Sequence, residues 1–156
     1  MSVSGVNNSN MASIRLAQSD DDVGRCFRVM QQLRPHLKDH EFVPAVRRQE
    51  REGYRLALLE EDGAVRAVAG YRVMDNLVSG RILYVDDLVT DSEVRSKGHG
   101  RAVLAWLIDR AREAGCQTLE LDSGVQRFDA HRFYLTNRMI ISSYHFRLTL
   151  EGDSPP

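Results

Sequence analysis

Apolar residues recur at helical spacing in the middle of the chain, between Gly98 and Gly115. The apolar positions three or four residues apart are Val103, Leu104, Leu107, Ile108 and Ala111. This spacing is typical of a helix with one buried face, and a glycine after the last apolar position is a common stop signal. The pattern therefore predicts a central helix that ends near Ala114.

Three further segments have helical spacing. The first follows the capping candidates 19–22 and ends before Pro35, with apolar residues at Val23, Cys26, Phe27, Met30 and Leu33. The second is more polar and covers Glu41 to Glu52, and the third covers Gln126 to Arg138. Together with the central helix, these segments predict about four helices.

Between the helices, short apolar or alternating segments predict strands. These are 14–16, 54–60, 65–74, 82–89, 118–122 and 139–150, and the last alternates at Tyr144, Phe146, Leu148 and Leu150. Asp62-Gly63 predicts a hairpin between the second and third strands. The strand–helix–strand unit around the central helix predicts a right-handed crossover between two parallel strands.

These elements predict an α/β (α+β) fold in a single domain over residues 13–150. Its mixed central sheet has an antiparallel N-terminal part followed by parallel strands. Residues 1–12 are rich in Ser, Asn and Gly and predict a disordered leader, and residues 151–156 predict a frayed tail.

Composition narrows the class of protein. The chain has 156 residues, of which 42% are hydrophobic and 28% charged, and 21 basic residues balance 22 acidic ones. This balance disfavours nucleic acid and anionic membranes as partners, and no apolar stretch approaches the length of a membrane span. The two cysteines, Cys26 and Cys116, are far apart, which favours reduced thiols in a cytoplasmic protein.

His36, His40 and Glu41 are the nearest approach to a metal site. The two histidines could share a helical face, but zinc needs three or four ligands and no convincing further ligand follows. The sequence therefore predicts no metal.

A basic, glycine-containing turn precedes the central helix, with the sequence Arg95-Ser96-Lys97-Gly98-His99-Gly100-Arg101. The first N–H groups of a helix have no acceptor in their own helix and lie at its positive dipole end. This turn therefore predicts a phosphate or pyrophosphate site. A dinucleotide fingerprint would have a third glycine where Val103 stands, and the G-x-x-x-x-G-K-[ST] phosphate loop is absent.

Two motifs resemble those of one enzyme family. Arg95-x-x-Gly98-x-Gly100 resembles the Q/R-x-x-G-x-G/A signature of the GNAT-type N-acetyltransferases, and 130–134 (Ala-His-Arg-Phe-Tyr) resembles their A-x-x-F/L-Y segment. Two departures are Arg127, where relatives often have asparagine, and 138–139, where many have Gly-Phe.

The resemblance implies acetyl-CoA as cosubstrate, bound in a cleft where the two parallel strands splay apart. Backbone groups around Leu88 and Val89 would pair with the pantetheine amides. The pyrophosphate would lie on the turn formed by Arg95, Lys97, Gly98, His99, Gly100 and Arg101, chiefly on its backbone N–H groups. Tyr134 would lie beside the thioester sulfur and protonate the departing thiolate.

Two adjacent carboxylates are candidates for taking the acceptor's proton. Asp86 and Asp87 point to opposite faces if their strand is regular. Asp87 matches the acidic position that the family often has before Leu-Val, so we select it as the catalytic carboxylate. It could equally hold the acceptor's ammonium group, and proton loss could run through water. Glu120 and Asp122 are second-rank candidates.

In such a family member, a primary amine attacks the thioester directly in a ternary complex. The acceptor is expected to be a small molecule, and the region of the first two helices would form one wall of its pocket. The alternative function is a non-catalytic, acyl-CoA-binding regulatory module on the same fold. A homodimer formed through strand exchange or sheet edges remains open.

Overall fold

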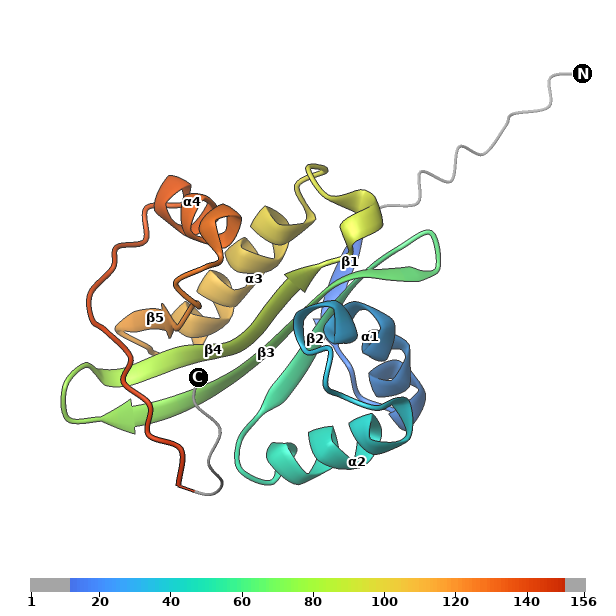
Figure 1. The fold of residues 1–156 in the computed structure, drawn as a ribbon, viewed down its shortest axis with the longest axis horizontal. Helices are drawn as coiled ribbons and strands as arrows, with labels where there is room; N and C mark the ends of the chain where they lie inside the picture. The colour runs from blue at the N-terminus through green and yellow to red at the C-terminus, as the bar shows by residue number, and fades with distance from the viewer. Residues whose placement is uncertain (1–11, 151–156) are drawn as a thin grey trace, which may run out of the picture. The chain divides into compact units, whose positions relative to one another are not determined.

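The computed structural model describes residues 12–150 (Figure 1). The predicted tail lies outside the described residues, as does the predicted leader apart from Ala12. Within the described residues, the chain divides after Leu121 into two compact units.

In the first unit, the described residues form a five-stranded sheet whose strands follow chain order. The strands are β1 (Ser13–Leu16), β2 (Arg55–Glu61), β3 (Ala64–Asn76), β4 (Gly80–Thr90) and β5 (Thr118–Leu121). Neighbours from β1 to β4 are antiparallel, and β4 and β5 are parallel. The predicted α/β fold with a mixed sheet is thus confirmed.

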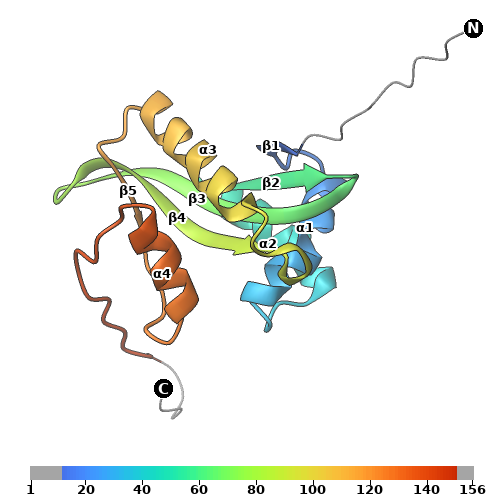
Figure 2. The same ribbon diagram turned by 90° about the horizontal axis from the view of Figure 1, so that it is seen from above.

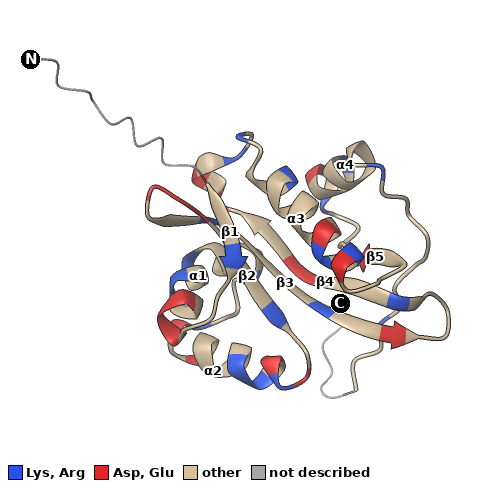
Figure 3. Cartoon of the chain, turned by 180° about the vertical axis from the view of Figure 1, so that it is seen from behind, with Lys and Arg blue, Asp and Glu red and all other residues tan. Residues whose placement is uncertain are grey.

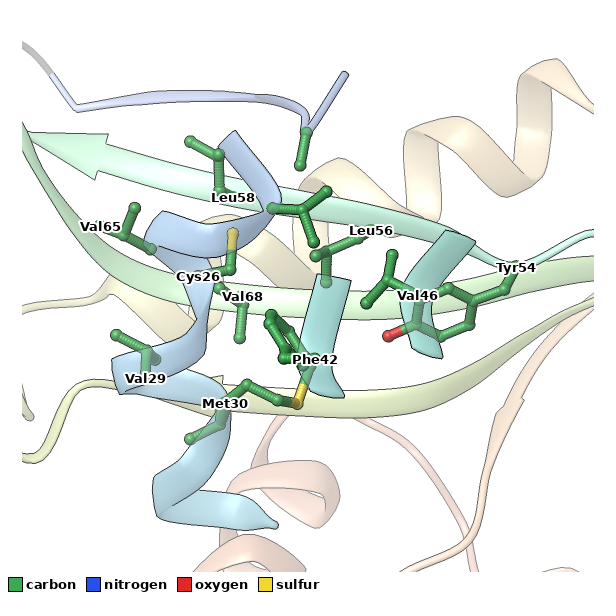
Figure 4. Packing of buried hydrophobic residues seen from close by; sticks show 13 residues of the cluster. Cys26, Val29, Met30, Phe42, Val46, Tyr54, Leu56, Leu58, Val65 and Val68 are labelled. Carbon is green, nitrogen blue, oxygen red and sulfur yellow. The ribbon is translucent and has the colours of Figure 1, made fainter. Parts of the chain in front are cut away.

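Helices cover both faces of this sheet, as Figure 2 shows. On one face lie α1 (Asp20–Leu33) and α2 (Asp39–Glu50), and on the other lies α3 (His99–Glu113). Each face has its own apolar cluster. The core under α1 and α2, drawn in Figure 4, includes Met30, Phe42 and Leu56, and the core under α3 includes Leu83, Val103 and Leu107.

The local sequence explains where α1 begins. The Ser19 hydroxyl accepts the Asp22 N–H, and the Asp22 carboxylate accepts the Ser19 N–H in return, which forms a capping box. Cys26 packs in the core on the inner face of α1, and burial raises the pKa of its thiol to about 12. This thiol is therefore protonated and inert at neutral pH, as a structural cysteine should be.

One irregularity interrupts the pairing of β3 with β4. Gly70 pairs with Asp87 and Tyr71 pairs with Val85, so Asp86 is an extra residue in β4. Such a bulge shifts the alternation of side chains by one position. Before it, Leu83 and Val85 face α3; after it, Asp87 faces α1. The expectation that Asp86 and Asp87 point to opposite faces is therefore wrong, because the strand is not regular at this point.

The second unit contains α4 (Phe128–Thr136), close to the predicted helix 126–138. The prediction of a strand in 139–150 is wrong, since these residues form neither helix nor strand in the described chain. Alternating sequence favours a strand, but a strand also needs a neighbour for its backbone hydrogen bonds.

We expect Gly70→Ala to destabilise the protein by about 1–3 kcal/mol, because overpacking a tight site costs that much. An added Cβ would lie 1.9 Å from the Tyr54 hydroxyl oxygen and 2.3 Å from its ring carbon Cζ. Thermal unfolding should show a midpoint lower by roughly 3–10 °C. As a control, Gly24→Ala on α1 meets only an ordinary contact at 4.0 Å and should stabilise its helix slightly. Equal midpoints for both variants would contradict the close packing of Tyr54 on Gly70.

Candidate active site

The far half of β4 has one open side. Its pairing with β5 covers only Ile82 to Val85, whereas β4 continues to Thr90 and stays paired with β3. From Asp86 to Thr90, the other side of β4 therefore has no partner strand within the described residues. Alternate backbone N–H and C=O groups of this stretch are left for another partner. Leu88 and Val89, the predicted pantetheine contacts, lie in this stretch.

A buried carboxylate fixes the chain where it leaves β4. Asp91 is fully buried and forms ion pairs with Arg28 of α1 and Arg66 of β3. It also accepts hydrogen bonds from Gln32 Nε2 (3.2 Å) and from the Glu93 N–H at the start of the short 3-10 helix Ser92–Val94. Burial opposes its charged form, but these partners outweigh it and the pKa of Asp91 falls to about 2.

The predicted pyrophosphate turn follows directly. Gly98 is the N-cap of α3 with φ +84°, a left-handed conformation that favours glycine. The first backbone bond of the helix runs from the Ala102 N–H to the Gly98 carbonyl at 3.0 Å, so the N–H groups of His99, Gly100 and Arg101 have no acceptor in their own helix. The side chains of Arg95, Lys97 and Arg101 are exposed around this turn, where Figure 3 shows basic positions.

His99 has a side-chain role that the sequence did not indicate. Its imidazole is buried, and Nε2 lies 3.1 Å from the Glu61 carboxylate at the end of β2. This contact ties the first residue of α3 to the β2–β3 hairpin, and so holds the turn in place.

On the face of the sheet that α1 and α2 cover, the Asp87 carboxylate accepts two hydrogen bonds, one from a neutral hydroxyl and one from a charged guanidinium group. The Tyr54 hydroxyl donates to Oδ2 at 2.8 Å, and Arg34 Nε donates to Oδ1 at 2.9 Å. Arg34 also donates to the Asp86 carbonyl at 2.9 Å, so it binds both residues of the bulge. Burial, and then the charge of Asp87, raise the pKa of Tyr54 well above its ordinary value, which keeps this hydroxyl a donor.

Asp86 joins the same polar cluster. Its carboxylate lies 3.1 Å from Arg72 Nε, and the Arg72 guanidinium lies over the Tyr54 ring at 5.7 Å from the ring centre. Burial raises the pKa of Asp86, although Arg72 opposes the shift. The two carboxylates therefore lie on one face with two arginines between α1 and the sheet.

A pocket of about 310 Å³ opens beside this cluster. Polar groups of Arg34, His36, Gln49, Tyr54 and Asp87 line it, and its apolar walls are Met30, Leu37, Phe42, Ala45 and Val46. Apart from Tyr54 and Asp87, these residues come from α1, α2 and the segment between them, which is the region predicted to form a wall of the acceptor pocket.

The remaining candidates have ordinary surroundings. Glu120 accepts the Thr118 hydroxyl at 2.8 Å, and Asp122 forms an exposed pair with His145 at 3.6 Å. His36 lies in a turn and His40 in the first turn of α2, so they share no helical face. Among residues 12–150, no cluster of three His, Cys, Asp or Glu side chains could hold a metal ion, and no helix is long and apolar enough to cross a membrane.

Tyr134 belongs to the second unit, on α4. Its side chain is half-buried, and its ring packs edge-on against Phe133 with centroids 5.5 Å apart. Burial raises the pKa of its hydroxyl, against the opposing charge of Arg127. The hydroxyl is therefore protonated at neutral pH, as a proton donor must be.

The structure thus brings most predicted site residues together in the first unit, on β4 and on the turn that follows it. It also adds residues that sequence reasoning missed, namely Arg34, Tyr54, Gly70 and Arg72. No spacing rule could have found them, because they converge from the end of α1, the residue before β2 and β3 only through the bulge and the sheet register.

Comparison with known proteins identifies the family. Residues 21–137 match the model of the Acetyltransferase (GNAT) family. The chain is 36% identical over 140 residues to the uncharacterized N-acetyltransferase YhdJ of Bacillus subtilis, covering 88% of this chain and 98% of that protein. The protein is therefore an acyltransferase with an α/β fold. It belongs to the GNAT acetyltransferase family.

Two further likenesses are less extensive in sequence. The chain is 36% identical over 97 residues to the aminoalkylphosphonate N-acetyltransferase of Salmonella typhimurium, covering 62% of this chain and 60% of that protein. It resembles the structure of an aminoglycoside N-acetyltransferase, AAC(6')-Iy, in complex with CoA, with a TM-score of 0.81 at 12% identity over 92% of this chain and 97% of that one. At this identity, the structural likeness shows the fold alone.

The depressed pKa of Asp91 predicts a pH-dependent part of the stability. A carboxyl with a pKa of about 2 in the folded state and near 4 when unfolded stabilises the protein above pH 4, by roughly 2 kcal/mol, and this is lost as the pH falls toward 2. Urea unfolding should therefore show a difference in the free energy of unfolding between the native protein and Asp91→Asn that is largest at pH 7. At pH 3, the pH-dependent part of this difference should be about half as large. Asp75→Asn, an exposed carboxyl paired with Arg81, should show almost no gap. A gap for Asp91→Asn that is the same at both pH values would contradict this role.

Proposed function

We propose that the protein transfers the acetyl group of acetyl-CoA to a primary amine of a small molecule, in a ternary complex without a covalent enzyme intermediate. The observation that supports this most directly is that three features follow one another along the chain. These are the open side of β4, the anchored turn and the N–H groups at the start of α3 that have no acceptor in their own helix. Within a stretch from Asp86 to Arg101, the chain offers first backbone partners for amides and then donors for a doubly charged phosphate group.

The turn suits a pyrophosphate in three respects. Its unsatisfied N–H groups lie at the positive end of a helix of 15 residues. Gly98 and Gly100 leave the backbone uncovered, and no heavy atom lies within 4 Å of where a Cβ of Gly98 would stand. Arg95, Lys97 and Arg101 add long-range attraction for an anion. Upstream, the backbone of Leu88 and Val89 would hold the pantetheine arm.

The acceptor amine would enter the pocket beside Asp87. This carboxylate is fixed from two sides by Tyr54 and Arg34, so it can hold an ammonium group at a defined place and take its proton, directly or through a water molecule. The volume of about 310 Å³ suits a small molecule. The name of the Salmonella relative, which acts on aminoalkylphosphonates, also favours a small amine.

Acetyl-CoA, when bound, supplies an activated thioester whose carbonyl carbon the neutral amine attacks. Two proton movements are then left to the chain. The Asp87 carboxylate takes the proton that the amine loses, directly or through a water molecule. The Tyr134 hydroxyl gives its own proton to the departing sulfur. The raised pKa of Tyr134 keeps that proton in place until the thiolate forms.

The first test is thermal unfolding with acetyl-CoA, CoA, ATP and NAD in parallel. A ligand at about 100 times its Kd stabilises the native state by about 2.7 kcal/mol, which raises the midpoint by roughly 5–10 °C for a chain of this size. We expect this shift with acetyl-CoA and CoA only, and a weaker one in Gly98→Ala, which strains the turn. A shift with ATP or NAD but with neither CoA species would refute the proposal.

The role of Tyr134 predicts a specific kinetic change. With free thiol release as the assay and a panel of small amines that includes aminoalkylphosphonates, Tyr134→Phe should lower kcat by roughly 100-fold or more, because it removes the general acid. The KM for acetyl-CoA and the thermal shift should change little. Tyr144→Phe, at a tyrosine that is 84% exposed, is the matched control. Full turnover in Tyr134→Phe would exclude this residue as the acid, and acetyl-CoA binding without turnover on any amine would favour the non-catalytic module.

A further inference from the structure

The charges that line the pocket beside Asp87 balance only as long as no amine is bound. Among the lining side chains, Asp87 carries a negative charge and Arg34 a positive one. The neighbouring Asp86 and Arg72 form an ion pair and neutralise each other. An ammonium group bound at Asp87 would therefore add a second cation to a site that has one carboxylate for both.

Asp87 can accept this ammonium group without losing its partners. The Tyr54 hydroxyl binds one of its oxygens and Arg34 binds the other, whereas a carboxylate has about four lone-pair sites. The ammonium and the guanidinium would then lie close together on the same carboxylate. In a pocket with apolar walls, solvent screens their repulsion poorly. A further negative charge would remove this cost.

Arg34 also has a hydrogen-bond donor left for such a charge. Its Nε donates to Asp87 and its Nη2 donates to the Asp86 carbonyl. Its Nη1 has no hydrogen-bond partner within residues 12–150, and the side chain is 42% exposed where it lines the pocket. A guanidinium group fixed in this way matches the oxygens of a carboxylate or a phosphonate.

The other polar side chains of the pocket add donors beside apolar walls. The Gln49 amide oxygen accepts Arg72 Nη2 at 3.3 Å, so the Gln49 amide nitrogen remains as a donor. His36 is exposed and can donate from its ring. The walls between these groups are apolar and include Met30 and Phe42 (Figure 4). Asp87 is thus the one carboxylate of a lining that otherwise offers donors and apolar surface.

We propose that the acceptor is an amine that also carries an anionic group, either a carboxylate or a phosphonate, on a short apolar chain. Its ammonium group binds Asp87 and its anionic group binds Arg34, so that the molecule neutralises the pocket and contacts the apolar walls with its chain. An acceptor with a second amine would place another cation against Arg34. This inference rests on the proposed transfer to a small amine and specifies which amines are used.

The test compares amines of similar size that differ in the charge of the group farthest from the amine. These are β-alanine and aminoethylphosphonate (negative), β-alaninamide (neutral) and diaminopropane (positive), with thiol release from acetyl-CoA as the assay. We expect kcat/KM to be roughly tenfold or more higher for the two anionic amines, because this is the contribution of one hydrogen bond between charged groups. The order of the two anionic amines tells whether a carboxylate or a phosphonate is preferred.

Variants of Arg34 separate recognition of the anion from support of Asp87. Arg34→Gln should lower the rate with every amine, because Asp87 loses a donor, but it should also bring the ratio of β-alanine to β-alaninamide close to one. Arg34→Lys keeps the positive charge and should retain part of the preference. The matched control is Arg48→Gln on α2, at an exposed arginine outside the pocket lining, which should keep the full ratio. Circular dichroism checks that the variants are folded.

The outcomes distinguish this inference from the function on which it rests. Turnover that is as fast with β-alaninamide or diaminopropane as with the anionic amines would overturn the inference and leave transfer to small amines standing. A preference for anionic amines that persists in Arg34→Gln would overturn the role of Arg34. Binding of acetyl-CoA without turnover on any of the four amines would refute both the inference and the proposed small-molecule acceptor.

Discussion

The extra residue that Asp86 adds to β4 moves every later side chain of this strand to the opposite face of the sheet. Without it, Asp87 would face α3 and the apolar core there, where an unpaired carboxylate would be costly to bury. With it, Asp87 meets Tyr54 and Arg34 on the face of α1 and α2. Leu88 remains on the α3 side. One bulge therefore places the polar and apolar side chains on suitable faces, although the sequence of this stretch, Asp-Asp-Leu-Val, does not alternate.

Packing makes the bulge the stable arrangement. The Tyr54 ring lies so close to Gly70 that no side chain fits at that position, and Gly70 is the residue of β3 opposite the bulge. Arg34 then donates to both the Asp87 carboxylate and the Asp86 carbonyl, which satisfies backbone and side chain together. The cluster illustrates how buried charges are retained when each has a hydrogen-bonded partner. Asp91 is another buried carboxylate with hydrogen-bonded partners, between the end of β4 and the turn before α3.

The sequence predicted the helices, the first five strands and the basic turn, because each depends on local spacing. It also pointed to Asp87 as a candidate, through its place at the end of a strand and its match to the family's acidic position, and its catalytic role stays a prediction. It could not predict the partners of the two carboxylates. Arg34 and Tyr54 reach Asp87, and Arg72 reaches Asp86, only through a bulge that has no sequence signature. The failed strand at 139–150 has a different cause. Its alternation is real, but a strand also needs a paired neighbour, and residues 139–150 pair with none in the described chain.

This failure also bears on the proposed catalysis. Tyr134 lies on α4, a helix of nine residues, and isolated helices of this length are marginal in water. Since α4 buries no residue and continues into the uncovered segment 139–150, the order of the proposed acid depends on whatever covers that segment. The turn before α3 is anchored within the first unit by Asp91 and His99, so its order does not depend on that segment. The affinity for the proposed cosubstrate and the turnover should therefore respond differently to changes in residues 139–150.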